Sequence, residues 1–393
     1  MNQLPSHLRR LHLVTEGQPY ELIAPADALV CPELLAKRLE AKVQVAAATT
    51  AADDVALPLL ADSALRGQTA MAGLTVDRWV EATLPIPALP EPASAALEQE
   101  VINGTIGRFT ERRIRERLEA TLELPPLPQM ARQIMALSGD DNATALDLVN
   151  LLEQDAALAA RLVGWANSPF YAAPGGVQTI NDAVLRVMGF EGALALAMGI
   201  VVGQNLPPAP ETGEGLRSFW MEGLLTASVM EQLHARASVT EFDAGSAYLV
   251  GLLCNFGTLV LAHTFPPQYV RIRNLEAANP HILYSHCDVA VLGMDREMIG
   301  TALLACWDLP DTISQPIREQ HSPDSTLPLA RLLRCARSLL ASEGLSSVPP
   351  QKVPLDTALA LGIEPDALDA TLDILRQPQE ELEVLARAFQ RAA

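Results

Sequence analysis

The stretch Ala244-Gly-Ser-Ala-Tyr-Leu-Val-Gly-Leu-Leu-Cys-Asn-Phe-Gly-Thr-Leu-Val-Leu-Ala262 carries no charged residue. A helix of this length is about long enough to cross a membrane. No cluster of Lys or Arg flanks it, although such clusters are common beside membrane helices. Ser246, Asn255 and Thr258 also interrupt the apolar pattern. We therefore favour a buried core helix over a membrane span.

The composition of the whole chain is that of a folded protein. Of its 393 residues, 49% are hydrophobic and only 19% are charged, which is the opposite of the balance found in disordered chains. This length predicts two or three domains. The net charge of −19 argues against general nucleic-acid binding and against docking on anionic lipid, because both depend on a cationic surface.

Residues that commonly carry chemistry are scarce. There are seven His residues, and the three Lys residues are Lys37, Lys42 and Lys352. The cysteines are odd in number and form no C-x-x-C motif: Cys31, Cys254, Cys287, Cys306 and Cys335. This pattern favours reduced thiols in a cytoplasmic protein, and residues 1–20 lack the apolar core of a signal peptide.

Residues 1–84 predict a small α/β domain, because short apolar runs alternate with residues that break regular structure. The predicted strands cover 20–24, 43–48 and 79–84, and a predicted helix covers 32–41. Four prolines fall within 85–97 and predict a stiff, extended linker, since proline fixes φ.

From residue 98 onward the apolar spacing is helical almost throughout, so the fold class is mainly α. The predicted helices cover 110–123, 128–137, 143–152, 156–166, 180–188, 191–202, 218–237, 244–263, 266–278, 296–307, 310–320, 327–341, 355–361, 365–375 and 379–391. Within this series we expect an all-helical domain over 98–323. We also expect a helical C-terminal extension over 324–393 that packs on this domain.

Several short motifs follow one another between Leu124 and Pro323. They are Leu124-Pro-Pro-Leu-Pro128, Leu152-Glu-Gln-Asp155, Trp165-Ala-Asn-Ser-Pro-Phe-Tyr171, Ile180-Asn-Asp-Ala183, Phe219-Trp220, Gly251-Leu-Leu-Cys-Asn-Phe-Gly257, Gly293-Met-Asp-Arg296 and Trp307-Asp-Leu-Pro310. In order and spacing they resemble the HDOD family, which are all-helical regulatory modules related to the HD metal-dependent phosphohydrolases. The resemblance covers about half of the chain and implies an HD-like helical bundle.

The resemblance also implies where a metal site would lie, and this sequence departs from it there. Cys254-Asn255 stands where the related enzymes have the His-Asp pair that ligates metal. Glu222 and Arg296 stand where further His ligands are common, and only His321 remains of an expected His-His pair. We therefore expect no metal, no cofactor and no catalytic residue. The vestigial site, which is also a possible ligand pocket, comprises Glu222, Cys254, Asn255, Arg296 and His321.

Two alternatives stay open for these positions. The helix around Cys254 is explained by core packing alone, with the thiol acting as a small apolar group. The cleft could instead bind an anion such as a nucleotide phosphate through Arg296, Asn255 and His321, because a guanidinium pairs well with phosphate.

A second set of residues is a possible partner surface. Asn167 and Ser168 are explained as a helix stop with capping side chains. They also lead into a loop with Phe170 and Tyr171, and aromatic residues at a loop tip can anchor an interface.

The N-terminal stretch from Gly17 to Asp27, followed by Leu34, Leu35 and Leu39, resembles part of the YbaK-type aminoacyl-tRNA deacylase domain. Those enzymes use a Lys on an earlier strand. No Lys precedes Lys37, which falls in a predicted helix, so the resemblance implies a degenerate domain without deacylase activity.

We therefore expect a non-catalytic bacterial signal-transduction protein that acts through signalling proteins or a bound nucleotide-type ligand. One alternative is a divergent metal-dependent phosphohydrolase that uses Glu222, Cys254 and His321 on a phosphodiester or nucleotide. Another is a binder of aminoacyl-tRNA or cyclic nucleotides without turnover. The partner, the input signal and the oligomeric state do not follow from the sequence.

Overall fold

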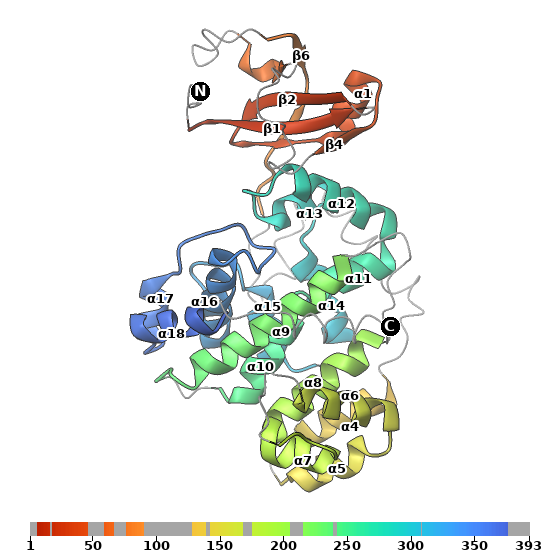
Figure 1. Cartoon of the computed structure of the whole chain (residues 1–393), viewed down its shortest axis with the longest axis vertical. Helices are drawn as coiled ribbons and strands as arrows, with labels where there is room; N and C mark the ends of the chain where they lie inside the picture. The colour runs from red at the N-terminus through yellow and green to blue at the C-terminus, as the bar shows by residue number, and fades with distance from the viewer. Residues whose placement is uncertain are drawn as a thin grey trace, which may run out of the picture. The chain divides into compact units, whose positions relative to one another are not determined.

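The computed structural model describes residues 6–15, 18–45, 59–66, 76–89, 128–138, 142–167, 175–204, 215–238, 242–307 and 309–375. The chain divides into two compact units (Figure 1). The first comprises Met1–Leu89 together with Val270–Gly293, and the second comprises Pro90–Tyr269 together with Met294–Ala393. The helices predicted over 110–123 and 379–391 lie outside the described residues, as does most of the predicted linker.

The first unit is built on a sheet of five described strands in the order β4-β1-β2-β5-β6. Strands β1 and β2 are antiparallel, as are β1 and β4, whereas β2–β5 and β5–β6 are parallel pairs. Strands β3 and β7 form a separate antiparallel pair. The strands are β1 (Leu8–Thr15), β2 (Gln18–Pro25), β3 (Ala28–Val30), β4 (Val43–Val45), β5 (Leu59–Asp62), β6 (Arg78–Val80) and β7 (Thr83–Pro85).

Alternating side chains of this sheet pack into two apolar clusters. Leu11 and Leu13 of β1 and Leu22 of β2 pack with Leu35 of helix α1 (Pro32–Leu39). A second cluster on residues of the opposite parity includes Ile23. Asp62 begins the 3-10 turn η2 (Ser63–Leu65) by accepting a hydrogen bond from the backbone of Ala64.

Two sequence predictions for this unit need correction. The single strand predicted over 79–84 is two strands, β6 and β7, which pair in different sheets. Strand β1 was not predicted, because its adjacent Arg9 and Arg10 hide the alternation, yet it pairs with β2 along its whole length. Helix α1 and strands β2 and β4 are confirmed, although β4 is described only to Val45.

The first unit also takes residues from far along the chain. Helix α12 (Pro266–Ala278) runs into it, and α13 (Tyr284–Leu292) lies within it. Ala278 is fully buried in the same apolar cluster as Leu22, Val30 and Leu35. The sequence pattern does not predict this grouping, since residues 270–293 fall inside the range predicted as one helical domain.

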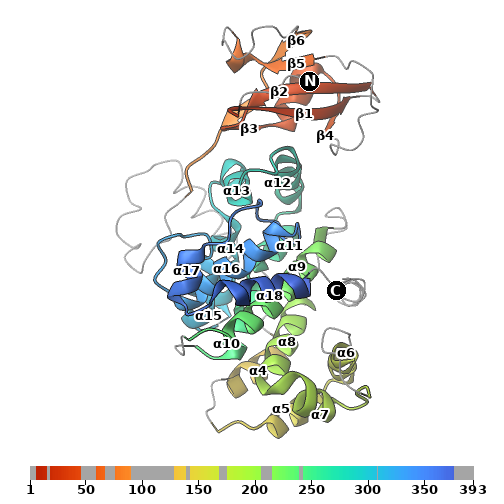
Figure 2. The same ribbon diagram turned by 60° about the vertical axis from the view of Figure 1, so that its left-hand side comes forward.

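The second unit is helical in its described residues (Figure 2). Its N-terminal helices are α4 (Gln129–Ser138), α5 (Ala145–Leu152), α6 (Ala156–Ala166), α7 (Ile180–Asp182), the π-helical η5 (Ala183–Met188) and α8 (Gly189–Gln204). They are followed by α9 (Gly215–His234), α10 (Ala244–Leu253), α11 (Phe256–Thr264), α14 (Arg296–Cys306), α15 (Asp311–Arg318), α16 (Pro328–Ser342), α17 (Leu355–Ala360) and α18 (Pro365–Leu375). Helix α10 packs between α8 and α9, and α16 packs on α9 and α15.

The sequence predicted one continuous helix for the uncharged stretch, but the structure contains two. The stretch is divided into α10 and α11 at Cys254 and Asn255, where Asn255 has a non-helical ψ of 12°. By length and composition alone, Ala244–Thr264 could cross a membrane, but 89% of its most apolar window is buried inside the fold. Gly251 allows close packing, because a Cβ there would lie 2.7 Å from the backbone nitrogen of Ala227 on α9. This burial is that of a core element.

Helix starts are fixed by side chains that accept hydrogen bonds from the first-turn backbone. Asp155, Asp243 and Asp295 do so for α6, α10 and α14. Thr179 caps α7, and the helix predicted over 180–188 changes to π geometry at Ala183.

Candidate functional site

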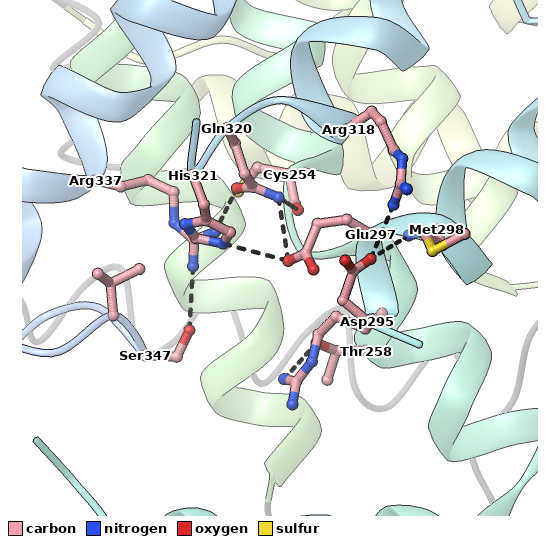
Figure 3. Close-up of polar contacts among 12 residues, drawn as sticks. Cys254, Thr258, Asp295, Glu297, Met298, Arg318, Gln320, His321, Arg337 and Ser347 are labelled. Carbon is pink, nitrogen blue, oxygen red and sulfur yellow. Dashed lines mark hydrogen bonds and ion pairs between the residues drawn. The ribbon is translucent and has the colours of Figure 1, made fainter. Parts of the chain in front are cut away.

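The five predicted site residues come from four regions of the second unit. Glu222 lies on α9, Cys254 and Asn255 join α10 to α11, Arg296 begins α14, and His321 follows α15. The first four are buried, and the side chain of His321 is 18% exposed. Figure 3 shows how Cys254 and His321 lie near Gln320, Glu297 and Arg337.

Glu222 accepts its hydrogen bonds from the C-terminal extension. Its Oε1 atom lies 3.0 Å from the guanidinium of Arg337 on α16, which is 2% exposed. The same oxygen accepts from Ser346 Oγ at 2.7 Å, from the Ser347 backbone at 2.9 Å and from Ser347 Oγ at 3.0 Å. The carboxylate is therefore paired with a cation and with three further donors.

Gln320 connects this ion pair to the junction of α10 and α11. Its side-chain oxygen accepts from Arg337, and its Nε2 donates to the carbonyl of Cys254 at 3.0 Å. The same Nε2 lies 3.4 Å from Glu297 Oε1, which is also 3.4 Å from His321 Nε2. Side chains from α14 and α16 and from the residues after α15 thus meet in one network (Figure 3).

A second group of charges lies at the start of α14. Asp295 accepts from the Met298 backbone at 2.8 Å and from Arg318 at 2.9 Å. Arg296 donates to Thr258 Oγ1 on α11 at 3.2 Å. With Arg296 only 3% exposed, its guanidinium is held inside the fold.

Burial and charge shift the pKa values of these groups. Burial works to raise the pKa of Glu222, but Arg337 and the hydrogen bonds from Ser346 and Ser347 outweigh it, so that pKa lies below its ordinary value. Burial raises the pKa of the Cys254 thiol to about 12. Glu222 therefore stays ionised at neutral pH, and Cys254 stays protonated.

His321 and Asp295 are shifted in opposite directions. Burial lowers the pKa of His321, which favours the neutral imidazole despite its contact with Glu297. Burial, together with the nearby Glu297, raises the pKa of Asp295 to about 6, although Arg318 opposes the rise. Asp295 therefore gains its proton near pH 6, whereas His321 stays neutral at pH 7.

Comparison with known families identifies this helical arrangement. The HDOD domain matches residues 124–323, which is about half of the chain. The chain belongs to the HDOD family. Glu222, Cys254, Asn255, Arg296 and His321 all fall inside the matched residues, whereas Arg337, Ser346 and Ser347 lie beyond them.

Two solved structures resemble more of this chain than the matched HDOD residues alone. A crystal structure from Marinobacter aquaeolei VT8, described as a candidate signal transduction protein, is 26% identical and covers 99% of this chain and 95% of its own, with a TM-score of 0.80. An HDOD domain protein of unknown function from Geobacter sulfurreducens is 19% identical and covers 72% of this chain and 98% of its own, with a TM-score of 0.58, which shows the fold alone.

A curated relative matches a smaller part. An uncharacterised protein from Treponema pallidum (strain Nichols) is 26% identical over 214 residues, which is 53% of this chain. The chain spans only 40% of that relative.

The residues of this HDOD site do not fit the metal centre of the related HD enzymes. A metal would have to displace the proton of the buried Cys254 thiol, whose pKa burial raises, and the neutral amide of Asn255 is a weaker ligand than the carboxylate expected there. Glu222 is already paired with Arg337, and Arg296 adds a second buried cation. Within the ranges that the structure describes, no three His, Cys, Asp or Glu residues are placed to hold a metal ion.

The predicted partner surface is described only in part. Asn167 ends α6, and its amide accepts from the Val177 backbone at 2.6 Å and donates to the Val177 carbonyl at 2.6 Å. Asn167 therefore holds together the two ends of the intervening segment. Ser168, Phe170 and Tyr171 lie outside the described residues.

Sequence reasoning missed Arg337, Glu297 and the two serines of the extension. Arg337 could have been found, because it falls on the apolar stripe of α16 between Leu333 and Leu340. A charged side chain on a buried face needs a buried partner. Ser346 and Ser347 carried no such signal, since they lie in an irregular connection.

Proposed function

We propose that this HDOD protein is a non-catalytic signal-transduction component. The observation that carries the proposal is the buried Arg337, which pairs with Glu222 and is also an electrostatic neighbour of Cys254 and His321. These three residues stand at positions where the resemblance places metal ligands. A guanidinium among them supplies positive charge that a metal ion would otherwise supply.

A guanidinium cannot take the part of the metal in HD-type hydrolysis. HD-type chemistry requires a metal that lowers the pKa of a bound water, which then attacks a phosphate ester. The guanidinium of Arg337 stays protonated and only donates hydrogen bonds, so it cannot bind and activate a water as a metal ion does. The network keeps buried charges satisfied but supplies no activated water.

The mode of action that we propose is binding of signalling proteins. Arg296, the main candidate for binding a phosphate, is buried and donates to Thr258, which argues against a nucleotide at this site. The candidate signalling role of the Marinobacter protein supports the same class of function. A degenerate YbaK-type origin of the N-terminal unit remains part of this proposal, and Lys37 lies on α1 rather than on a strand. We also propose a cytoplasmic location, since Cys31, Cys254, Cys287 and Cys335 are free thiols.

The first experiment measures metal content and hydrolysis with the full chain. The protein is purified after separate exposure to Mn²⁺, Zn²⁺ and Fe²⁺, and bound metal is measured by elemental analysis. Hydrolysis of bis(p-nitrophenyl) phosphate is then followed. We expect substoichiometric metal and no turnover. A stoichiometric metal, with turnover that is lost in His321→Ala, would instead establish the phosphohydrolase alternative.

A second arm tests the role of Arg337 directly. If its charge replaces that of a metal, Arg337→Met should gain stabilisation by Mn²⁺ or Zn²⁺, whereas the wild type should not. The matched control is Arg334→Met on the same helix. Equal thermal shifts in all three proteins would contradict the assignment. A panel of nucleotides and cyclic dinucleotides in the same assay tests the ligand alternative, and a specific shift would favour it.

A further inference from the structure

Residues 270–293 belong to the N-terminal unit although they lie inside the matched HDOD residues. The chain enters this unit after Tyr269 and leaves it after Gly293. On one side it continues from α11, which begins next to Asn255, and on the other it leads to Asp295 and α14. We call residues 270–293 the coupling segment, because its two ends connect to the two helices beside the candidate site.

Asn279 attaches the coupling segment to strand β3. It is fully buried, and its Oδ1 accepts from the Val30 backbone at 2.8 Å and from Arg9 at 2.5 Å. Its Nδ2 donates to the carbonyls of Val30 at 2.8 Å and Leu275 at 2.6 Å. All four hydrogen-bonding positions of the amide are used. Asn279 thus pairs with Val30 as a neighbouring strand would.

Arg9 extends the attachment to β1. Its guanidinium donates to the carbonyls of Ala28 and Ala278, each at 3.1 Å, as well as to Asn279. It also lies 3.2 Å from Nδ1 of His281, whose Nε2 is 3.0 Å from the Ala26 carbonyl. Since arginine only donates and a carbonyl only accepts, His281 is neutral and carries its proton on Nε2.

Other contacts spread the attachment over the unit. Arg271 pairs with Glu33 of α1 at 2.8 Å, and His286 Nδ1 lies 2.8 Å from the Pro87 carbonyl. Together with the burial of Ala278 in the apolar cluster, these contacts make the coupling segment part of the core of the N-terminal unit.

Helices α11 and α14, which flank the coupling segment along the chain, pack tightly against each other in the second unit. A Cβ on Gly257 of α11 would overlap the carbonyl oxygen of Arg296, and a Cβ on Gly300 of α14 would lie 2.7 Å from the Gly257 nitrogen. Helices α11 and α14 therefore meet backbone to backbone. Interiors packed this closely deform little, so a displacement of one helix must displace the other.

We propose that the coupling segment transmits conformational change between the N-terminal sheet and the helices that carry Asn255, Asp295 and Glu297. Packing around Asn279 sets the stability of α11 and α14 at the site. A ligand or partner on the N-terminal unit would act through this segment, whether or not the site itself binds anything.

Hydrogen exchange of the full chain, followed by mass spectrometry, tests the proposal with Asn279→Ala. The matched control is Asn274→Ala, since Asn274 is exposed on α12, the helix that ends directly before Asn279. Loss of the Asn279 amide leaves the Val30 groups unpaired, so we expect about tenfold faster exchange in residues 20–30. We expect faster exchange also in 251–260 and 294–303, with residues 145–152 and 365–375 unchanged.

Three results would overturn the proposal. Faster exchange confined to 20–30 and 270–293 would make the segment a local support only. A uniform increase over the whole chain would show general destabilisation, and the same pattern in Asn274→Ala would remove the specific role of Asn279. If Asn279→Ala does not fold, Arg9→Met replaces it, with Arg10→Met on the same strand as its control.

Discussion

Glu222 and Arg337 form an ion pair whose side chains are only 7% and 2% exposed. A buried pair contributes little net stability, but removal of one partner leaves the other charge without compensation. Arg337→Met should therefore lower the free energy of unfolding by about 3–5 kcal/mol. Urea unfolding measures this loss, with Arg334→Met as the control.

The double variant Glu222→Gln/Arg337→Met separates charge from packing. Gln retains an oxygen acceptor for Ser346 and Ser347 but carries no charge. It should recover part of the stability lost in Arg337→Met. No recovery would show that the loss arises from the missing side-chain volume of Arg337.

Asp295 predicts a pH dependence of stability. Its folded-state pKa is raised to about 6 from 3.8, so the folded state binds this proton more tightly than the unfolded state does. The contribution of Asp295 to stability is therefore fully present below pH 3.8 and is lost as pH rises through 6. In Asp295→Asn, which retains a capping side chain, this decline should disappear from unfolding curves measured across that range.

The control for this profile is Asp311→Asn, an exposed position on α15. The difference between wild type and Asp295→Asn isolates Asp295 from His321, whose lowered pKa acts in the other direction. For His321, stability is lost as pH falls below its ordinary pKa of 6.5, because the unfolded state then binds the proton more readily. A difference curve that is flat between pH 4 and 6 would contradict the role given to Asp295.

At this scale the sequence identified positions but not partners. Glu222, Cys254 and His321, which the motif order singled out, fall within the matched HDOD residues, and the structure brings all three near Arg337. The side chain of Asn255 makes no capping bond at the start of α11. The partners Arg337, Ser346 and Ser347 lie beyond the motifs, and only tertiary packing brings them to Glu222.

At the scale of elements, the contact of α11 with α14 depends on glycine. A Cβ on Gly257 would overlap backbone atoms of Arg296, which cannot move as a flexible side chain can. Gly257→Ala should therefore cost about 3 kcal/mol or more. The matched control is Gly164→Ala on α6, where nothing lies within 4 Å, and it should stabilise the helix by about 0.5–1 kcal/mol. Thermal unfolding compares the two, and equal effects would contradict this packing.

Helices were predicted better than strands for a physical reason. The bounds of α6, α12 and α18 are confirmed as predicted, because apolar periodicity and flanking breakers are local signals. Strand β5 was missed, since its four residues are all buried in the middle of the sheet and show no alternation. Helix α13 was missed because it is short and lacks a distinct apolar face.

At the scale of the whole molecule, thiol reactivity follows from the burial of the cysteines. Cys31, Cys254, Cys287 and Cys335 are buried, and burial raises the pKa of both Cys254 and Cys335 to about 12. These four of the five thiols should react with Ellman's reagent at pH 8 only after denaturation. Absorbance with and without guanidinium chloride measures the difference. Rapid reaction of more than one thiol in the native protein would contradict it.

The division of the chain into units is the part of the fold that local pattern could not give. The motifs indicated a continuous helical domain, but residues 270–293 group with residues 1–89. This pairing depends on single contacts such as Asn279 with Val30, which are 249 positions apart. No periodicity encodes a partner at that separation.

That separation matters during synthesis. The N-terminal sheet emerges from the ribosome before residues 270–293, so its core lacks Ala278 and Asn279 until about 200 further residues have been added. At the usual bacterial rate of about 5–20 residues per second, the wait is roughly 10–40 seconds. Throughout that time the apolar face around Leu22 and Val30 is incomplete. The nascent chain should therefore depend on chaperones early, and truncation before Gly293 should leave the N-terminal strands prone to aggregation.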